Sequence, residues 1–315
     1  MSGDALAQPI AVIARLGIPA LLADGPRTLR SLAEAAGANE VTLGRVLRAL
    51  AAMGVLRRSA PDTFEATPLS AQLLPGAPMH AVALLAGAPS RVAAHHLGHA
   101  VETGEDAFVH AHGASLYDYL SHHPEEAALF DEVQAQHWEM LDVERHYDFS
   151  AARKVVDVGG GRGELLARLL DKHPALAGAL VERPDVLPRA EARLSAWRDR
   201  VELHADFFAG VPSGGDIYIL AFVLHNWADG PAVELLTRCR EAMSERARML
   251  VIENLLDGDP AFVALLDLEM LVYSSGGRER YQDEYAELLS RAGLRLARTL
   301  PTNSSVRLLE AERQP

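Results

Sequence analysis

The sequence contains a single cysteine, Cys239, which excludes an intramolecular disulfide and a metal cage built from thiolates. It also lacks any apolar run that approaches the roughly 18 residues needed to span a bilayer. Its first residues, MSGDALAQ, lack the basic and apolar segments of a secretory signal peptide. We therefore expect a cytoplasmic protein with no membrane partner.

Positive charge is scarce, above all in the first half of the chain. The formal net charge of the whole sequence is -13, and residues 1–150 contain 9 arginines, no lysine and 18 acidic residues. Nucleic-acid binding needs a basic footprint that neutralises phosphates. The charge distribution therefore argues against a nucleic-acid partner.

The N-terminal residues show two helical patterns followed by a hairpin pattern. Thr28 is expected to cap a helix over LRSLAEAA that stops at Gly37, and Thr42 to cap a second helix that ends at Gly54. The segments VLRR and TFEATP, separated by the polar turn SAPD, indicate a hairpin. This order is typical of a winged helix, used either to bind DNA or to dimerise. Because cations are scarce, we favour dimerisation and keep a DNA-binding regulator as a remote alternative.

Residues 80–146 have a mostly helical pattern and contain 10 of the 13 histidines. His95 and His99 stand four residues apart, a spacing that could place two imidazoles on one metal ion. No acidic or cysteine ligand stands at the expected spacing beside them. We therefore expect no metal site here, and histidines that line a pocket or face water.

From Lys154 onward, short β-branched runs alternate with helical patterns. The runs VVDV, GALVE, VELH, DIYIL and MLVIE are typical of buried parallel strands. The last segments, LRLARTL and SSVRLLEA, indicate an antiparallel pair that closes the sheet edge. The sequence therefore predicts a doubly wound α/β domain that begins near residue 150.

A glycine-rich turn follows the first of these strands. In VVDVGGGRG the glycines let a ligand approach the backbone, and the helix that follows supplies unpaired amides. A dinucleotide fingerprint would need glycine or alanine where Glu164 or Leu166 stands, so the spacing favours S-adenosylmethionine over NAD. Glu182 ends the next strand, where one carboxylate can accept from both ribose hydroxyls. The expected cofactor-binding residues of this region are Asp157, Gly159, Gly160, Gly161, Gly163 and Glu182.

Three further residues with catalytic chemistry lie at or after the ends of later strands. His225 follows DIYILAF, Glu253 ends MLVIE, and Glu279 lies in GGRER. Histidine suits a general base because its pKa lies near the working pH, and a carboxylate that accepts from its other ring nitrogen orients the ring. We therefore predict His225 as the base, with Glu253 and Glu279 as its acidic partners at the same edge of the sheet.

These motifs resemble those of a known enzyme family. DVGGGRG, VERPDV, ADFF, VLHNWAD, VIE and GGRERYQDEYAELLSRAGL occur in the order and spacing of bacterial and plant S-adenosylmethionine-dependent O-methyltransferases that act on phenolic and polyketide acceptors. The N-terminal segment LGIPALLADGPRTLRSLAEAAG, with ETGEDAFVHAHG and HYDFS further on, extends the resemblance over essentially the whole chain. The sequence departs from the family in a shorter first helix and in Glu182, where an aspartate is usual.

The resemblance implies a Rossmann-like class I methyltransferase domain preceded by a mostly α-helical winged-helix dimerisation domain. The expected domains are residues 1–80 for the winged helix, 81–150 for a helical linker that contributes to the substrate pocket, and 151–315 for the catalytic domain. It further implies a homodimer that methylates a hydroxyl of an aromatic secondary metabolite, as in antibiotic biosynthesis. A homologue that methylates nitrogen or carbon, or that has been recruited to decarboxylation, hydroxylation or a pericyclic reaction, remains an alternative.

The resemblance also assigns two residues to the adenine of the cofactor, and further residues are expected around the acceptor. Asp206 and Phe207 of ADFF would hold adenine, the carboxylate accepting from its exocyclic amine and the ring stacking on its face. Met270 and Tyr273, in the helical pattern VALLDLEMLVY, face either the acceptor pocket or the core. With Trp138 they are the expected substrate-binding residues, and Trp227 is expected to pack beneath His225.

Overall fold

The computed structural model describes residues 4–258, 260–274 and 276–314. The chain divides into two compact units, one formed by Met1–Val92 with His123–Gln136 and the other by Ala93–His122 with His137–Pro315. Among the described residues, no helix has both the length and the apolar character needed to cross a bilayer.

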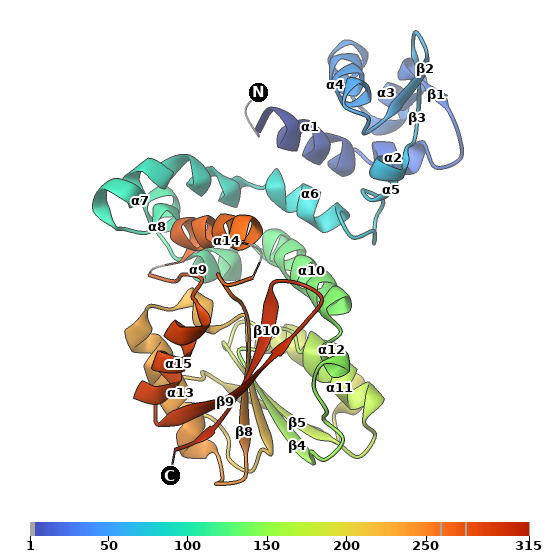
Figure 1. Ribbon diagram of the computed structural model, residues 1–315. Coiled ribbons are helices and arrows are strands. Elements are labelled where there is room, and N and C mark those ends of the chain that lie inside the picture. The colour runs from blue at the N-terminus through green and yellow to red at the C-terminus, as the bar shows by residue number, and fades with distance from the viewer. Residues whose placement is uncertain (1–3, 259, 275, 315) are drawn as a thin grey trace. The chain divides into compact units, whose positions relative to one another are not determined.

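The first unit combines short helices with a small sheet of order β1-β3-β2 (Figure 1). Its elements are α1 (Asp4–Arg15), α2 (Ile18–Leu21), β1 (Arg27–Thr28), α3 (Leu29–Ala36), α4 (Glu40–Ala52), β2 (Arg57–Ala60), β3 (Thr63–Glu65), α5 (Pro68–Ala71), α6 (His80–Ala86) and the first part of α10 (Pro124–Leu141). The hairpin of β2 and β3 is the one that the sequence predicted. Ile13, Leu32, Leu47 and Phe64 form the centre of its core.

The two predicted helix caps of this unit turn out differently. Thr28 caps α3, because its side chain accepts a hydrogen bond from the amide of Ser31, and Gly37 ends the helix with a φ of 62°. The prediction that Thr42 caps the next helix is wrong. Asn39 is the cap, and its side-chain oxygen accepts from the amide of Thr42 at 3.1 Å. An asparagine three residues earlier competes for the same role and starts α4 one turn sooner.

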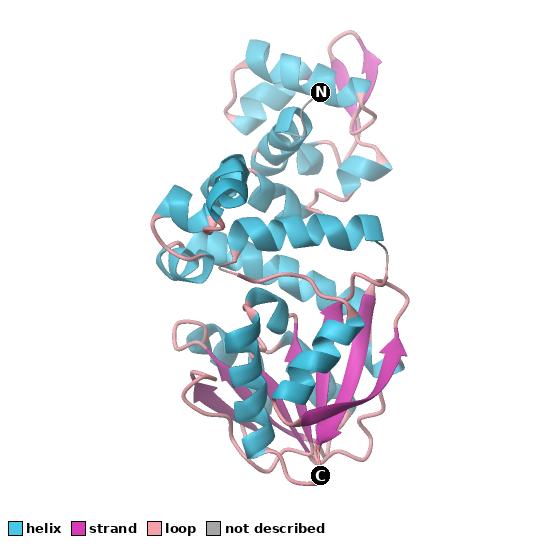
Figure 2. Cartoon of the chain, turned by 60° about the vertical axis from the view of Figure 1, so that its left-hand side comes forward, coloured by secondary structure: helices cyan, strands magenta, loops and turns pink. Residues whose placement is uncertain are grey.

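The second unit contains a seven-stranded sheet with helices on both faces (Figure 2). Its helices are α7 (Leu97–Thr103), α8 (Ala107–His112), α9 (Leu116–His122), α11 (Glu164–Lys172), α12 (Leu187–Leu194), α13 (Asp229–Ala242), α14 (Pro260–Tyr273), α15 (Gln282–Arg291) and the end of α10. Its strands are β4 (Lys154–Val158), β5 (Ala177–Glu182), β6 (Val201–Ala205), β7 (Ile217–Ala221), β8 (Arg248–Asn254), β9 (Leu294–Pro301) and β10 (Val306–Arg313). Short 3-10 turns cover Pro89–His96, Val143–Arg145, Ser195–Trp197 and Leu224–Asn226.

The strand order β6-β5-β4-β7-β8-β10-β9 confirms the predicted doubly wound sheet with an antiparallel closing pair. Alternate residues of β4 serve the two faces: Val156 and Val158 pack with α13 and α15, whereas Val155 packs with α11 and α12. A strand buried on both faces therefore reads as a continuous apolar run. The chain builds the sheet outward from β4 in one direction through β5 and β6, and then returns to place β7 on the other side of β4. A ligand site is expected at such a reversal, at the carboxyl ends of β4, β5 and β7.

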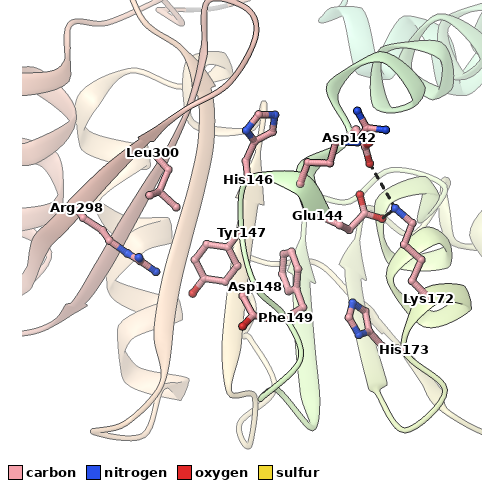
Figure 3. A pocket seen from close by; sticks show the side chains of 11 residues that line it. Asp142, Glu144, His146, Tyr147, Asp148, Phe149, Lys172, His173, Arg298 and Leu300 are labelled. Atoms are coloured by element: carbon pink, nitrogen blue, oxygen red, sulfur yellow. Dashed lines mark hydrogen bonds and ion pairs between the residues drawn. The ribbon is translucent and has the colours of Figure 1, made fainter.

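The segment before β4 is anchored by paired charges. Lys172 lies 3.4 Å from Asp142 and 3.3 Å from Glu144, and the guanidinium of Arg298 lies over the ring of Tyr147 at 5.8 Å. These side chains line a cavity of about 720 Å³ (Figure 3). Its lining includes none of the residues predicted to bind the cofactor or to catalyse, and its cations are engaged with neighbouring acids or rings. We therefore regard this cavity as a structural feature of the segment before β4 and not as the catalytic site.

Candidate active site

The glycine turn after β4 adopts backbone conformations that L side chains rarely reach. Gly159, Gly161 and Gly163 have φ values of 73°, 58° and 83°. The amide of Gly161 donates to Oε2 of Glu182 at 2.8 Å. The side chain of Glu182, which ends the neighbouring strand β5, therefore holds the backbone of the turn. Helix α11 begins directly after the turn.

Asp157 is fully buried beneath this turn. Neither of its carboxylate oxygens has a hydrogen-bond partner among the described residues. Burial, reinforced by the negative charge of Glu182, raises the pKa of Asp157 to about 7. A buried polar group without a partner is costly, so this carboxyl is a group whose partner a ligand can supply.

Glu182 ends β5 and accepts two backbone hydrogen bonds, from Gly161 at 2.8 Å and from Arg183 at 2.7 Å. Burial raises the pKa of Glu182, although these two amides and the charge of Arg183 oppose that shift. A carboxylate can accept about four hydrogen bonds, so positions remain for two vicinal hydroxyls.

Asp206 contacts Glu182 through the backbone, and the two aromatic residues that follow Asp206 pack with Trp227. The amide of Asp206 donates to the Glu182 carbonyl at 2.9 Å, and the φ of Asp206 is 59°, a strained value outside glycine. Phe207 lies next to Phe208, with ring centroids 5.1 Å apart. Sequence reasoning placed Trp227 beneath His225, and the structure places its ring edge-on against Phe208 at 4.9 Å. The result is a cluster of three aromatic rings, two of which belong to the residues that directly follow Asp206.

His225 and its two predicted acidic partners come together. Nδ1 of His225 lies 3.0 Å from Oε1 of Glu279 and 3.7 Å from Oε2 of Glu253. The side chain of His225 is 14% exposed, whereas those of Glu253 and Glu279 are 0% and 1% exposed. The imidazole is therefore the member of this group that a substrate can reach. Because an ionised carboxylate only accepts, the contact with Glu279 favours the neutral tautomer that carries its proton on Nδ1, in which Nε2 is the acceptor.

The two acids do different work. Oε1 of Glu253 accepts from the amides of Val223, Leu224 and His225 at 3.1, 2.9 and 3.3 Å. Glu253 therefore holds the backbone of the turn, and Glu279 holds the ring. Burial raises the pKa of Glu253 to about 7 against the opposing effect of His225.

The pKa of His225 is raised above its ordinary value of 6.5. Burial alone would lower it, but the negative charges of Glu253 and Glu279 outweigh burial. The same three side chains present ligand atoms within 4.8 Å of one another, a spacing that a cation could also use. Three backbone amides occupy Oε1 of Glu253, so one of its two oxygens serves the turn and not a cation. His99, whose spacing from His95 was considered for a metal site and set aside, stacks on His110 with ring centroids 3.8 Å apart.

Residues of α9 approach the same site and were missed from the sequence. Arg183 lies 2.9 Å from Asp118 and over the ring of Tyr117 at 5.8 Å. Burial and the charges of Glu182 and Glu253 raise the pKa of Tyr117. Tyr117 therefore shares the electrostatic environment of both the predicted ribose acid and the predicted catalytic acid. Only the fold could reveal this, because α9 precedes those strands by many residues and shows no motif.

The residues predicted to bind substrate differ in their burial and in whether the structure describes them. Tyr273 is 9% exposed and packs in a small core with Phe108, at 5.8 Å between ring centroids, and Met270 is half-buried. Trp138 lies among the residues 136–140, whose side chains are outside the described part of the chain. Asp267 of α14, which sequence reasoning missed, accepts the amide of Glu279 at 2.8 Å and so ties this helix to the catalytic segment.

Comparison with known proteins gives consistent results along the whole chain. Residues 94–295 match the family model of the O-methyltransferase domain, and residues 1–76 that of the O-methyltransferase dimerisation domain. The chain is 41% identical to the mitomycin biosynthesis 6-O-methyltransferase of Streptomyces lavendulae, over 99% of this chain and 93% of that protein. It also resembles the solved structure of the mitomycin 7-O-methyltransferase MmcR, with a TM-score of 0.93, 42% identity and coverage of 99% and 95%.

Further relatives mark the range of chemistry on this fold. An O-methyltransferase from neocarzinostatin biosynthesis, solved with S-adenosylmethionine and 2-hydroxy-5-methyl naphthoic acid, superposes with a TM-score of 0.87 at 32% identity, over 98% and 96% of the two chains. The aclacinomycin 10-hydroxylase RdmB of Streptomyces purpurascens is 35% identical over 91% of this chain and 80% of that protein. Similarity of this kind therefore extends beyond O-methylation.

Proposed function

The chain belongs to the S-adenosylmethionine-dependent O-methyltransferases, and from this premise we propose that it methylates a hydroxyl of an aromatic secondary metabolite, with His225 as the general base. The residues that carry the proposal are His225 and Glu279, whose 3.0 Å contact through Nδ1 orients the ring and leaves Nε2 as the nitrogen for the substrate. A relative named as a 2,7-dihydroxy-5-methyl-1-naphthoate 7-O-methyltransferase and the structure solved with 2-hydroxy-5-methyl naphthoic acid support an aromatic acceptor.

The residues at the glycine turn fit the cofactor of this family. The unpartnered carboxyl of Asp157 and the remaining acceptor positions of Glu182 suit its polar groups, and the rings beside Asp206 suit its adenine. We assign the cofactor to Asp157, Gly159, Gly160, Gly161, Gly163, Glu182, Asp206 and Phe207. When bound, S-adenosylmethionine supplies an electrophilic methyl group.

The protein's own part in the reaction is to align the acceptor and remove its proton. Nε2 of His225 accepts the proton of the substrate hydroxyl, and the imidazolium that forms is stabilised by Glu279 at 3.0 Å and Glu253 at 3.7 Å. Holding the acceptor in place contributes as well, because positioning converts a bimolecular step into an effectively unimolecular one.

The proposal is tested with S-adenosylmethionine that carries an isotopic label on its methyl group and a panel of phenols, naphthoates and hydroxyquinones. We expect label in the product, and a kcat lowered by on the order of 10² or more in His225→Gln, with nearly unchanged binding of S-adenosylhomocysteine by calorimetry. We also expect the rate to persist in the presence of a chelator, since the base needs no metal.

A converted product without label would show that this homologue performs other chemistry, as the hydroxylase relative does. Full activity of His225→Gln would show that proximity alone drives the transfer. Loss of activity on chelation would contradict a base that needs no metal.

A further inference from the structure

The turn between β7 and α13 carries His225, and the shape of this turn decides where the imidazole lies. Glu253 holds its amides, as described above. Its carbonyls have a separate partner. Nη1 of Arg280 donates to the Leu224 carbonyl at 3.0 Å, and Nη2 donates to the Trp227 carbonyl at 2.7 Å. The residues on both sides of His225 and Asn226 are therefore tied to one guanidinium.

Arg280 is 0% exposed, which is unusual for an arginine. Its charge is matched by Asp229, at the start of α13, with Oδ1 accepting from Nη2 at 2.8 Å and from Nε at 3.2 Å. The guanidinium also lies over the ring of Tyr285 at 5.9 Å. A buried cation is retained in a fold only when its donors find acceptors, and here they find the turn of His225.

The main chain of Arg280 is fixed independently of its side chain. The amide of Leu256 donates to the Arg280 carbonyl at 3.1 Å, just beyond the strand that carries Glu253. Gly277 lets the same segment lie close against the turn, since any larger residue would place its Cβ 2.4 Å from the His225 carbonyl oxygen. The segment that delivers Glu279 to the ring thus also delivers Arg280 to the backbone.

We propose that Arg280 is a positioning residue for methyl transfer: it holds the carbonyl side of the 224–227 turn, as Glu253 holds the amide side, and so fixes His225 against Glu279. The inference rests on the proposed function of His225. It assigns to Arg280 no contact with substrate or cofactor, and it predicts an effect on turnover with little effect on binding.

Lysine cannot replace arginine in this role. An ammonium is a compact point charge, whereas the planar guanidinium presents five donors in a fixed geometry and here reaches two carbonyls and a carboxylate together. Arg278, two residues earlier, is the matched control. It bonds to Glu284 at 2.7 Å and lies 3.5 Å from Asp229, but its side chain is 40% exposed, and no described contact joins it to the carbonyls of the turn.

The experiment compares Arg280→Lys, Arg280→Gln and Arg278→Gln with the unchanged protein. For both Arg280 variants we expect kcat to fall roughly tenfold to a hundredfold, as for a misplaced catalytic group, with KM and S-adenosylhomocysteine affinity changed less than about threefold. The histidine titration that disappears in His225→Gln, followed by NMR, should shift toward the ordinary histidine pKa, because the ring loses its fixed contact with Glu279. Arg278→Gln should behave as the unchanged protein.

Arg280→Lys keeps the charge and decides the matter if Arg280→Gln does not fold. A kcat and an imidazole titration that are unchanged in Arg280→Lys would overturn the proposal, as would equal effects in the Arg278 control. The NMR titration needs no methyl transfer. If the unchanged protein transfers no methyl group, the proposed function fails, and a shifted titration in Arg280→Lys still shows that Arg280 sets the environment of His225.

Discussion

At the scale of single residues, the site is defined by buried carboxyl groups that differ in how many hydrogen bonds they accept. Glu253 has three amide donors and Glu182 has two, whereas Asp157 has none among the described residues. Since an unpaired buried carboxylate is expensive, its neutral form is favoured until a partner arrives. The least satisfied acid thus lies under the glycine turn, where we place the cofactor.

The pH dependence of catalysis follows from the pair of His225 and Glu279. The base must be neutral to accept a proton, and its pKa is raised above 6.5, so kcat/KM should rise with pH through a value above the ordinary one. Glu279→Gln removes a negative charge that favours the imidazolium. We therefore expect the rising limb of the pH–rate profile to move to lower pH while kcat falls by on the order of 10². A profile that keeps its position would contradict the assigned pair.

Asp157 should make the free protein less stable as the pH rises. The pKa of this carboxyl is about 7 in the fold against 3.8 for an ordinary aspartate, so between about pH 4 and pH 7 the folded state binds a proton that the unfolded chain has lost. The free energy of unfolding therefore falls through this range. Asp157→Asn cannot titrate, and its free energy of unfolding should fall less steeply, measured by urea denaturation at one protein concentration. Equal slopes for both proteins would exclude this role of Asp157.

At the scale of elements, the glycine turn between β4 and α11 depends on space as much as on φ. A Cβ on Gly160 would lie 2.3 Å from Oδ2 of Asp157 and 2.6 Å from a methyl carbon of Leu180. Both neighbours are buried, so neither can yield cheaply. The turn is therefore a packed element that sits directly on the carboxyl assigned to the cofactor.

Gly160→Ala should displace this turn. Overpacking costs typically about 1–3 kcal/mol, which corresponds to roughly a tenfold to hundredfold weaker binding of S-adenosylhomocysteine if the cofactor must restore the turn. Calorimetric titration measures this effect. Gly98→Ala, in α7 and with nothing within 4 Å of the added carbon beyond its chain neighbours and its own helix backbone, is the control and should bind normally. Normal binding by both variants would show that the cofactor does not rest on this turn.

At the scale of the whole molecule, the chain combines a family dimerisation domain with a catalytic domain. The formal net charge of -13 and the absence of lysine in residues 1–150 disfavour a nucleic-acid partner for the N-terminal helices and hairpin. Dimerisation uses the same elements without a basic surface. The domain limits of 1–80, 81–150 and 151–315 stay a prediction.

The oligomeric state gives a direct test at this scale. The chain has a mass of 34.0 kDa, and we expect light scattering coupled to gel filtration to report twice this mass at micromolar concentration. Because association depends on protein concentration, dilution should shift the equilibrium from the dimer toward the single chain. A single-chain mass at every concentration would contradict the assignment of the N-terminal domain.

Local patterns in the sequence were sufficient for much of this protein. Apolar runs fix strands that are buried on both faces, and VVDVGGGRG specifies a strand, a turn and a helix over a few consecutive residues. The carboxyl ends of parallel strands meet at one edge, so His225 and Glu253 could be brought together from chain order alone. The wrong cap at Thr42 shows the limit of such reasoning, because two capping residues stood within one turn.

Only the tertiary structure decided how the side chains divide the work. Glu253 binds the backbone of the turn, Glu279 binds the ring of His225, and Arg280 holds the carbonyls of the same turn. Tyr117 approaches from α9. All of these contacts join segments that are far apart in the chain. Such contacts follow from packing and from the satisfaction of buried polar groups, and neither has a periodicity that a sequence can display.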